Sequence, residues 1–264
     1  MPFAAVNGQR IHYADSGGDG PAVVFSHGFF MDQDMWDPQV EELRPAYRCL
    51  AINARGFGLT ESDGQPFTYW DLADDIVAVM DHAGVGSAVL VGLSQGGFTT
   101  QRAAIAHPTR VRAIVLCDTD CEVETSETKP MYYGTKDALL ANGWSTELAQ
   151  GMAGMLFGPG YDASYWIDRW QTNPPERIGP AFDTLIERDD IKDRLGEITC
   201  PALVLHGELD ATMPIERAND LCARITNCEG VVVISGAGHT SNLENRDEFN
   251  LALRPFVMKH SASP

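Results

Sequence analysis

A lone serine between glycines follows a short apolar run near the middle of the chain, and this pattern limits the possible folds more than any other. It occupies residues 89–97, where Ser94 stands between Gly92 and Gly96. The spacing fits the G-x-S-x-G turn, in which a strand passes sharply into a helix and leaves the serine hydroxyl exposed. Glycines flank such a serine because a Cβ atom there would collide with neighbouring groups. Ser94 is therefore predicted to be a nucleophile.

Strand-like and helix-like segments alternate along most of the chain. Asn7 and Gly8 predict a hairpin within residues 3–15, because both residues tolerate positive φ. Further strands are predicted at residues 22–25, 47–52, 87–93, 111–117, 202–206 and 231–234. Helices are predicted at residues 36–43, 68–82, 95–106 and 214–224, and within 243–257, where Pro255 should bend or end the helix. The alternation predicts an α/β fold with a mostly parallel sheet.

The composition narrows the classes of partner and location. The length of 264 residues suits one domain with an insertion. A net charge of −18 argues against nucleic-acid and anionic membrane partners, which need clustered Lys and Arg. The first residues lack the pattern of a signal peptide, so a cytoplasmic location is expected. Nothing in the sequence indicates the oligomeric state.

The cysteines show no spacing typical of a metal site. There are six of them, without a C-x-x-C pair or a Cys/His cluster. The nearest possible pairs are Cys117 with Cys121 and Cys222 with Cys228. Because a cytoplasmic setting disfavours disulfides, we expect reduced thiols.

Polar residues follow three of the predicted strands at the positions where ligands bind in parallel sheets. Ser94 ends the strand at 87–93, Asp210 follows the strand at 202–206, and His239 follows the strand at 231–234. A serine hydroxyl is a poor nucleophile at neutral pH. It needs an imidazole to accept its proton and a carboxylate to hold that imidazole in the productive tautomer. These three residues are therefore predicted to form a catalytic triad.

Other acids and histidines offer alternatives for these roles. Asp118 and Asp120 follow the strand after the serine and compete with Asp210 for the role of the acid. His27 and His206 are interpreted as loop-bracing residues rather than as catalytic bases.

With these residues in their chain order of Ser, Asp and His, the sequence resembles an α/β-hydrolase over nearly its whole length. The resemblance implies a mostly parallel central sheet with helices on both faces and a helical lid inserted after the sixth strand. The core would comprise residues 1–120 and 191–264, and the lid residues 121–190. The His27-Gly28-Phe29 segment matches the oxyanion loop of the family. The oxyanion hole would therefore consist of the backbone N–H groups of Phe29 and Gln95, and no metal or organic cofactor is implied.

The sequence departs from the commoner family pattern at Phe30, where relatives often have proline, and at Asn53, where they often have aspartate. Asn53 lacks a charge that could have braced Arg55. The lid is rich in Met, Tyr and Trp, which suggests an apolar cavity with adaptable walls. The substrate pocket is predicted to include the residues Phe30, Trp144, Met155 and Trp166.

The serine at position 94 distinguishes this chain from relatives with other chemistry. Haloalkane dehalogenases and epoxide hydrolases would require an aspartate there. The chain is similar to the branch that holds enol-lactone hydrolases, small esterases and cofactor-free perhydrolases. It is expected to be a carboxylesterase or lactonase acting on a small molecule. The alternatives are a carbon–carbon bond hydrolase of ring-cleavage products, although Thr240 stands where those relatives often carry tryptophan, and a non-catalytic receptor with the same fold.

Overall fold

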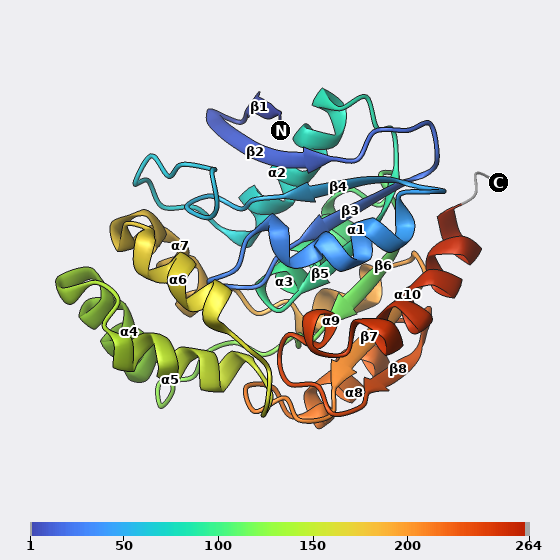
Figure 1. Ribbon diagram of the computed structural model, residues 1–264. Helices are drawn as coiled ribbons and strands as arrows, with labels where there is room; N and C mark the ends of the chain where they lie inside the picture. Colours follow the sequence, from blue (N-terminus) through green and yellow to red (C-terminus); the bar gives the residue numbers. More distant parts are fainter. Residues whose placement is uncertain (1, 262–264) are drawn as a thin grey trace.

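An 8-stranded sheet forms the centre of the computed structural model, which describes residues 2–261, and its strands lie in the order β1-β2-β4-β3-β5-β6-β7-β8 (Figure 1). The strands are β1 Phe3–Val6, β2 Gln9–Asp15, β3 Ala22–Ser26, β4 Arg48–Ile52, β5 Ala88–Leu93, β6 Val111–Cys117, β7 Ala202–Gly207 and β8 Cys228–Ile234. The β1–β2 and β2–β4 pairs are antiparallel, and the pairs from β4 through β8 are parallel. The predicted mostly parallel sheet is confirmed.

Helices cover both faces of this sheet. They are α1 Asp37–Leu43, α2 Tyr69–His82, α3 Gln95–Ala106, α8 Ile215–Arg224, α9 Ser241–Glu244 and α10 Arg246–Ser261, with short 3₁₀ helices η1 Gln33–Trp36 and η3 Lys192–Glu197. A third 3₁₀ helix, η2 Pro175–Ile178, belongs to the segment between β6 and β7. Val24 packs in a cluster with residues of α2, α3 and α8, whereas its neighbours Val23 and Phe25 pack in a cluster with residues of α1 and α10. Successive side chains of a strand point to opposite faces, so the central strands are apolar throughout.

The ends of two helices follow from local chemistry. Thr68 caps α2: its side chain accepts from the Asp71 N–H and the Asp71 carboxylate accepts from the Thr68 N–H, an arrangement known as a capping box. The prediction for the last helix was only partly right, because α10 continues past Pro255 to Ser261. Pro255 and Leu251 lie on the exposed side of α10, where water can bind the carbonyl that the proline leaves without a donor.

A group of helices separates β6 from β7 in the sequence. It comprises α4 Lys129–Asn142, α5 Thr146–Leu156, α6 Ser164–Thr172 and α7 Gly179–Ile186. In Figure 1 these helices, coloured green to yellow, lie together on one side of the sheet. A buried cluster joins them to the core, since Leu139 and Phe182 pack with Phe29 and Phe57. Among the described residues, no helix combines the length and hydrophobicity needed to cross a bilayer.

One cysteine pair differs from the expectation of reduced thiols. Cys222 in α8 and Cys228 at the start of β8 form a disulfide. The chain turns back between α8 and β8, and this brings their Cα atoms to 5.5 Å, a separation that suits a disulfide. The other cysteines of the chain are free: Cys49, Cys117, Cys121 and Cys200. The cytoplasmic location stays a prediction.

The disulfide should stabilise the protein measurably. It closes a loop with a sequence separation of 6, for which the chain-entropy model gives about 2 kcal/mol. We expect C222S/C228S to melt about 4–8 °C below the wild type under non-reducing conditions, and the two proteins to converge when the wild type is reduced. Mass spectrometry after maleimide labelling of the unfolded, unreduced protein should find Cys222 and Cys228 unlabelled. Labelling of both would contradict the disulfide.

Candidate active site

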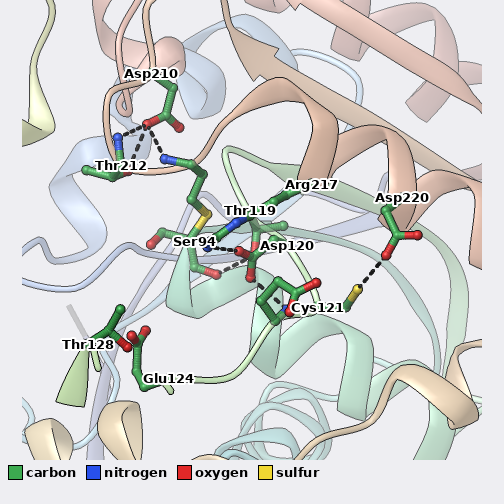
Figure 2. Close-up of polar contacts among 12 residues, drawn as sticks. Ser94, Thr119, Asp120, Cys121, Glu124, Thr128, Asp210, Thr212, Arg217 and Asp220 are labelled. Atoms are coloured by element: carbon green, nitrogen blue, oxygen red, sulfur yellow. Dashed lines mark hydrogen bonds and ion pairs between the residues drawn. The ribbon is translucent and has the colours of Figure 1, made fainter. Parts of the chain in front are cut away.

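Ser94 lies in the sharp turn between β5 and α3, as the glycine pattern predicted. Its backbone has φ 53° and ψ −116°, a conformation that side-chain-bearing residues rarely adopt. The side chain is nearly buried, with the residue 8% exposed. Its N–H donates to the Cys117 carbonyl at 2.9 Å. Its carbonyl accepts from Thr119 Oγ1 at 2.9 Å (Figure 2). The strained turn is thus held from β6.

Glycines allow the start of α3 to pack directly against neighbouring backbone. A Cβ atom on Gly96 would lie 2.1 Å from the Ser26 carbonyl oxygen, and one on Gly92 would lie 2.2 Å from the Gly96 carbonyl oxygen. No side chain fits at either position. The end of β3 and the beginning of α3 therefore touch, which brings Gln95 next to the loop that carries Phe29.

Phe29 and Gln95 each present a backbone N–H that has no acceptor within the described part of the chain. Both residues are buried, at 7% and 3% exposure. A buried N–H group without a partner is rare, since it loses hydration without gaining a hydrogen bond. The first N–H groups of a helix also carry partial positive charge, which applies to Gln95 at the start of α3. These donors suit an anionic oxygen.

His27 fixes the orientation of the Phe29 donor. The Ala54 N–H donates to His27 Nε2 at 3.0 Å, so the ring proton resides on Nδ1, which donates to the Gly28 carbonyl at 2.8 Å. Because that carbonyl shares a planar peptide unit with the Phe29 N–H, the two groups turn together. Burial lowers the pKa of His27 to about 4, so the ring stays neutral. The interpretation of His27 as a loop-bracing residue is confirmed.

His239 binds the carboxylate of Asp210. His239 Nδ1 lies 2.7 Å from Asp210 Oδ2. The other oxygen of Asp210 accepts from the backbone N–H groups of Thr212 and Met213 at 2.8 and 3.0 Å and from Thr212 Oγ1 at 2.7 Å. Thr212 Oγ1 also lies 2.6 Å from His239 Nδ1. Sequence reasoning missed Thr212, although an Asp that accepts from the N–H two residues ahead is a common turn pattern.

The electrostatics of this pair favour an ionised carboxylate beside a basic imidazole. Burial opposes ionisation of Asp210, but the nearby His239 and the hydrogen bonds to its oxygens hold the pKa of Asp210 below its usual value. Burial also disfavours the charged form of His239, yet the negative charge of Asp210 outweighs it and raises the pKa of His239. Within residues 2–261, the hydrogen bonds of the His239 ring do not include one from Ser94 Oγ. Such catalytic contacts are often long without substrate.

Asp118 was an alternative to Asp210 for the role of the acid, but its carboxylate binds other groups. It is fully buried with φ 44°, and it accepts from the Gly207 N–H at 2.7 Å and from Ser241 Oγ at 2.6 Å. It therefore connects the end of β7 to the segment just after His239. Burial and the neighbouring Asp210 carboxylate raise the pKa of Asp118.

Two further acids near the site also bind partners other than His239. Asp120, the second alternative acid, pairs with Arg217 at 2.9 Å (Figure 2). Glu244 supports the histidine loop: it accepts from the N–H groups of Gly238 and Thr240, on either side of His239, at 2.9 and 3.2 Å. Glu244 also accepts from the Gly158 N–H, which follows α5, at 2.7 Å.

One group of side chains could in principle hold a metal ion. Ligand atoms of Asp118, His206 and Asp210 lie within 4.8 Å of one another. However, both carboxylates already accept hydrogen bonds from the protein, and His206 Nε2 lies 2.9 Å from the Met213 carbonyl. As predicted, His206 braces a loop. These three possible metal ligands are thus already engaged in hydrogen bonds that hold the loop of Asp210.

The predicted pocket residues lie in different surroundings. Phe30 and Trp144 pack edge to face, with ring centroids 5.1 Å apart. Trp166 is buried in α6 against Tyr165, with ring centroids 5.1 Å apart. Met155 is 47% exposed and lies outside the buried clusters of the described residues. The structure brings the first two together and leaves Met155 apart from them.

The two departures from the family pattern are accommodated locally. Phe30 adopts φ 66°, a left-handed conformation that proline could not reach. Asn53 accepts from the Gln33 N–H at 2.7 Å, and its Nδ2 lies 2.9 Å from His12 Nδ1. Arg55 is braced instead by Asp75, through hydrogen bonds of 2.7 and 2.9 Å.

Comparisons with known proteins agree with this architecture. The sequence profile described as alpha/beta hydrolase fold matches residues 21–246. A 3-oxoadipate enol-lactonase from Acinetobacter baylyi is 26% identical over 255 residues, which cover 94% of this chain and 93% of the relative. A thermophilic esterase from Thermogutta terrifontis has a TM-score of 0.88 at 28% identity and 99% coverage of both chains. An enol-lactonase from Burkholderia xenovorans has a TM-score of 0.89 at 27% identity, covering 97% of this chain and 100% of that one.

The hydrogen bond between His239 and Asp210 can be tested without any substrate. A proton shared by imidazole Nδ1 and a buried carboxylate exchanges slowly and resonates far downfield in proton NMR spectra. We expect such a signal in the wild type at a pH where His239 is protonated, its loss in D210N, and its retention in D118N. Loss in D118N with retention in D210N would assign the partner of His239 to Asp118.

Proposed function

This chain belongs to the α/β-hydrolase fold family, and on that basis we propose that it is a serine hydrolase that cleaves a carboxylic ester or a lactone. The observation that carries the proposal is the pair of buried, partnerless N–H groups of Phe29 and Gln95 beside the strained Ser94. An enzyme that forms an oxyanion during acyl transfer requires such donors. The esterase and the enol-lactonases among its relatives support the substrate class.

In the proposed first half of the reaction, Ser94 Oγ attacks the carbonyl carbon of the substrate and its proton passes to His239 Nε2. The π electrons of the carbonyl move onto its oxygen, which becomes an oxyanion. As the carbonyl reforms, the ester C–O bond breaks and the leaving oxygen takes the proton from His239. An acyl-enzyme on Ser94 remains. In a lactone the leaving hydroxyl stays attached to the acyl group.

In the second half, water replaces the leaving group. It gives a proton to His239 and its oxygen attacks the acyl carbon, and Ser94 leaves as an alkoxide that recovers the proton from His239. Asp210 keeps the proton of His239 on Nδ1, so that Nε2 is free to accept. The N–H groups of Phe29 and Gln95 stabilise the oxyanion in both halves. Loss of one such donor typically costs about 100- to 1,000-fold in rate.

We further propose that residues 121–190 act as a lid that shapes the substrate pocket, with residues 1–120 and 191–264 as the catalytic core. Support comes from the aromatic contacts that the insertion makes with the loop after β3. Phe30 packs against Trp144 and against Phe182 of α7, with ring centroids 5.1 and 5.6 Å apart. These rings would give the substrate pocket part of its apolar wall.

Hydrolysis of p-nitrophenyl acetate and butyrate tests the proposal directly. We expect S94A to lower kcat by at least about 10⁴-fold, because the nucleophile is removed. S87A is the matched control: Ser87 lies just before β5, at the opposite end of the strand from Ser94, and should leave kcat unchanged. A panel of lactones and of esters with increasing acyl length then defines the preferred substrate. Activity that survives in S94A, or ligand binding without any turnover, would refute the serine-hydrolase mechanism.

The pH dependence should report the neighbourhood of His239. Only neutral His239 can accept the proton of Ser94, and the Asp210 carboxylate raises the pKa of His239 above the usual 6.5. We therefore expect kcat/KM to fall as the pH drops through a value above 6.5. An acidic limb centred at or below that value would mean that the carboxylates do not stabilise the protonated ring. Steady-state rates in buffers of constant ionic strength give this limb.

A further inference from the structure

The turn that carries the Phe29 donor has an unfavourable backbone conformation. The Met31 N–H donates to the Gly28 carbonyl at 3.1 Å, which closes a tight turn over Phe29 and Phe30. Phe30 has φ 66° at the third position of this turn, where glycine is strongly preferred because side chains disfavour positive φ. A turn of this kind with phenylalanine needs support from its surroundings.

That support comes from a helix of the insertion. Trp170 in α6 donates its indole N–H to the carbonyl of Phe30 at 2.7 Å. Its ring stacks on Trp144, with centroids 5.3 Å apart and planes 20° from parallel, and Trp144 in turn contacts the ring of Phe30. Phe30 is thus held through its carbonyl and through its ring.

The residues next to the turn are held by the same helix. Arg169, which precedes Trp170, forms ion pairs with Asp32 and, at 3.0 Å, with Asp34. Tyr165, one helical turn earlier, donates its hydroxyl to Asp34 at 3.1 Å. Asp32 is almost completely buried, so its pairing with Arg169 is not a loose surface contact. Helix α6 therefore fixes the whole segment from Phe30 to Asp34.

We propose that Trp170 is a positioning residue of the oxyanion hole. By holding the Phe30 carbonyl it keeps Phe30 in the left-handed conformation, and this keeps the preceding peptide groups, including the Phe29 N–H, directed at the developing oxyanion. The inference rests on the proposed function, because it assigns to Trp170 an effect on the transition state of that reaction. Residues 121–190 would then contribute to catalysis as well as to the wall of the pocket.

The variant W170F removes the indole N–H and keeps an aromatic ring. We expect kcat for p-nitrophenyl acetate to fall at least about 10-fold, while KM changes by less than about twofold. The loss in kcat should be smaller than the about 100- to 1,000-fold loss that follows removal of an oxyanion-hole donor. The affinity for phenylboronic acid, which binds Ser94 as a tetrahedral adduct, should fall in parallel with kcat/KM. W70F is the matched control: Trp70 in α2 donates its indole N–H to Asp189, which follows α7, at 2.9 Å. It should lower the melting temperature without changing kcat.

A second variant tests the route through Phe30. Glycine adopts φ 66° without support, so the activity ratio of F30G to F30G/W170F should be close to one, whereas the ratio of wild type to W170F is large. Equal ratios in the two backgrounds, a W170F variant as active as W70F, or a loss confined to KM would overturn the inference. Absence of Ser94-dependent hydrolysis in the wild type would instead reject the proposed function, so the two failures are distinguishable.

Discussion

A contact between two main chains, with no room for a side chain, is the constraint on which the site depends. The beginning of α3 rests on the end of β3 because Gly96 faces the carbonyl of Ser26 without a Cβ atom between them. Side chains would separate these segments by several ångströms, and the N–H groups of Gln95 and Phe29 would move apart with them. Packing at the level of the backbone thus sets the geometry of the donors before any side chain takes part.

Carboxylates hold the loops that this contact does not reach. Asp118 connects the end of β7 to Ser241, and Glu244 binds the amides on both sides of His239. Each accepts backbone N–H groups that would otherwise be buried without partners, so the loops gain hydrogen bonds and lose freedom together. Among the acids of residues 2–261, only Asp210 forms a hydrogen bond with the ring of His239. Asp210 orients the ring of His239, whereas Asp118 and Glu244 fix the loop segments that carry Asp210 and His239.

The sequence predicted the features that depend on local patterns. The glycine spacing predicted the turn at Ser94. The polar residues that follow the apolar runs predicted that Asp210 and His239 lie together. The features that it missed depend on contacts between distant residues. Trp170 reaches Phe30 across a separation of 140 residues, and Asp75 takes over the bracing of Arg55 that Asn53 cannot provide. Cys222 and Cys228 were expected to be reduced because a cytoplasmic location was assumed, and not because their spacing argues against a disulfide.

The same disulfide lies at the amino end of β8, whereas His239 lies beyond its carboxyl end. A strand of 7 residues separates them, or about 20 Å at 3.3 Å per residue. The bond therefore reinforces the edge of the sheet at a distance from His239. The redox state of this cysteine pair should therefore affect the stability of the sheet edge and leave the distant loop of His239 as it is.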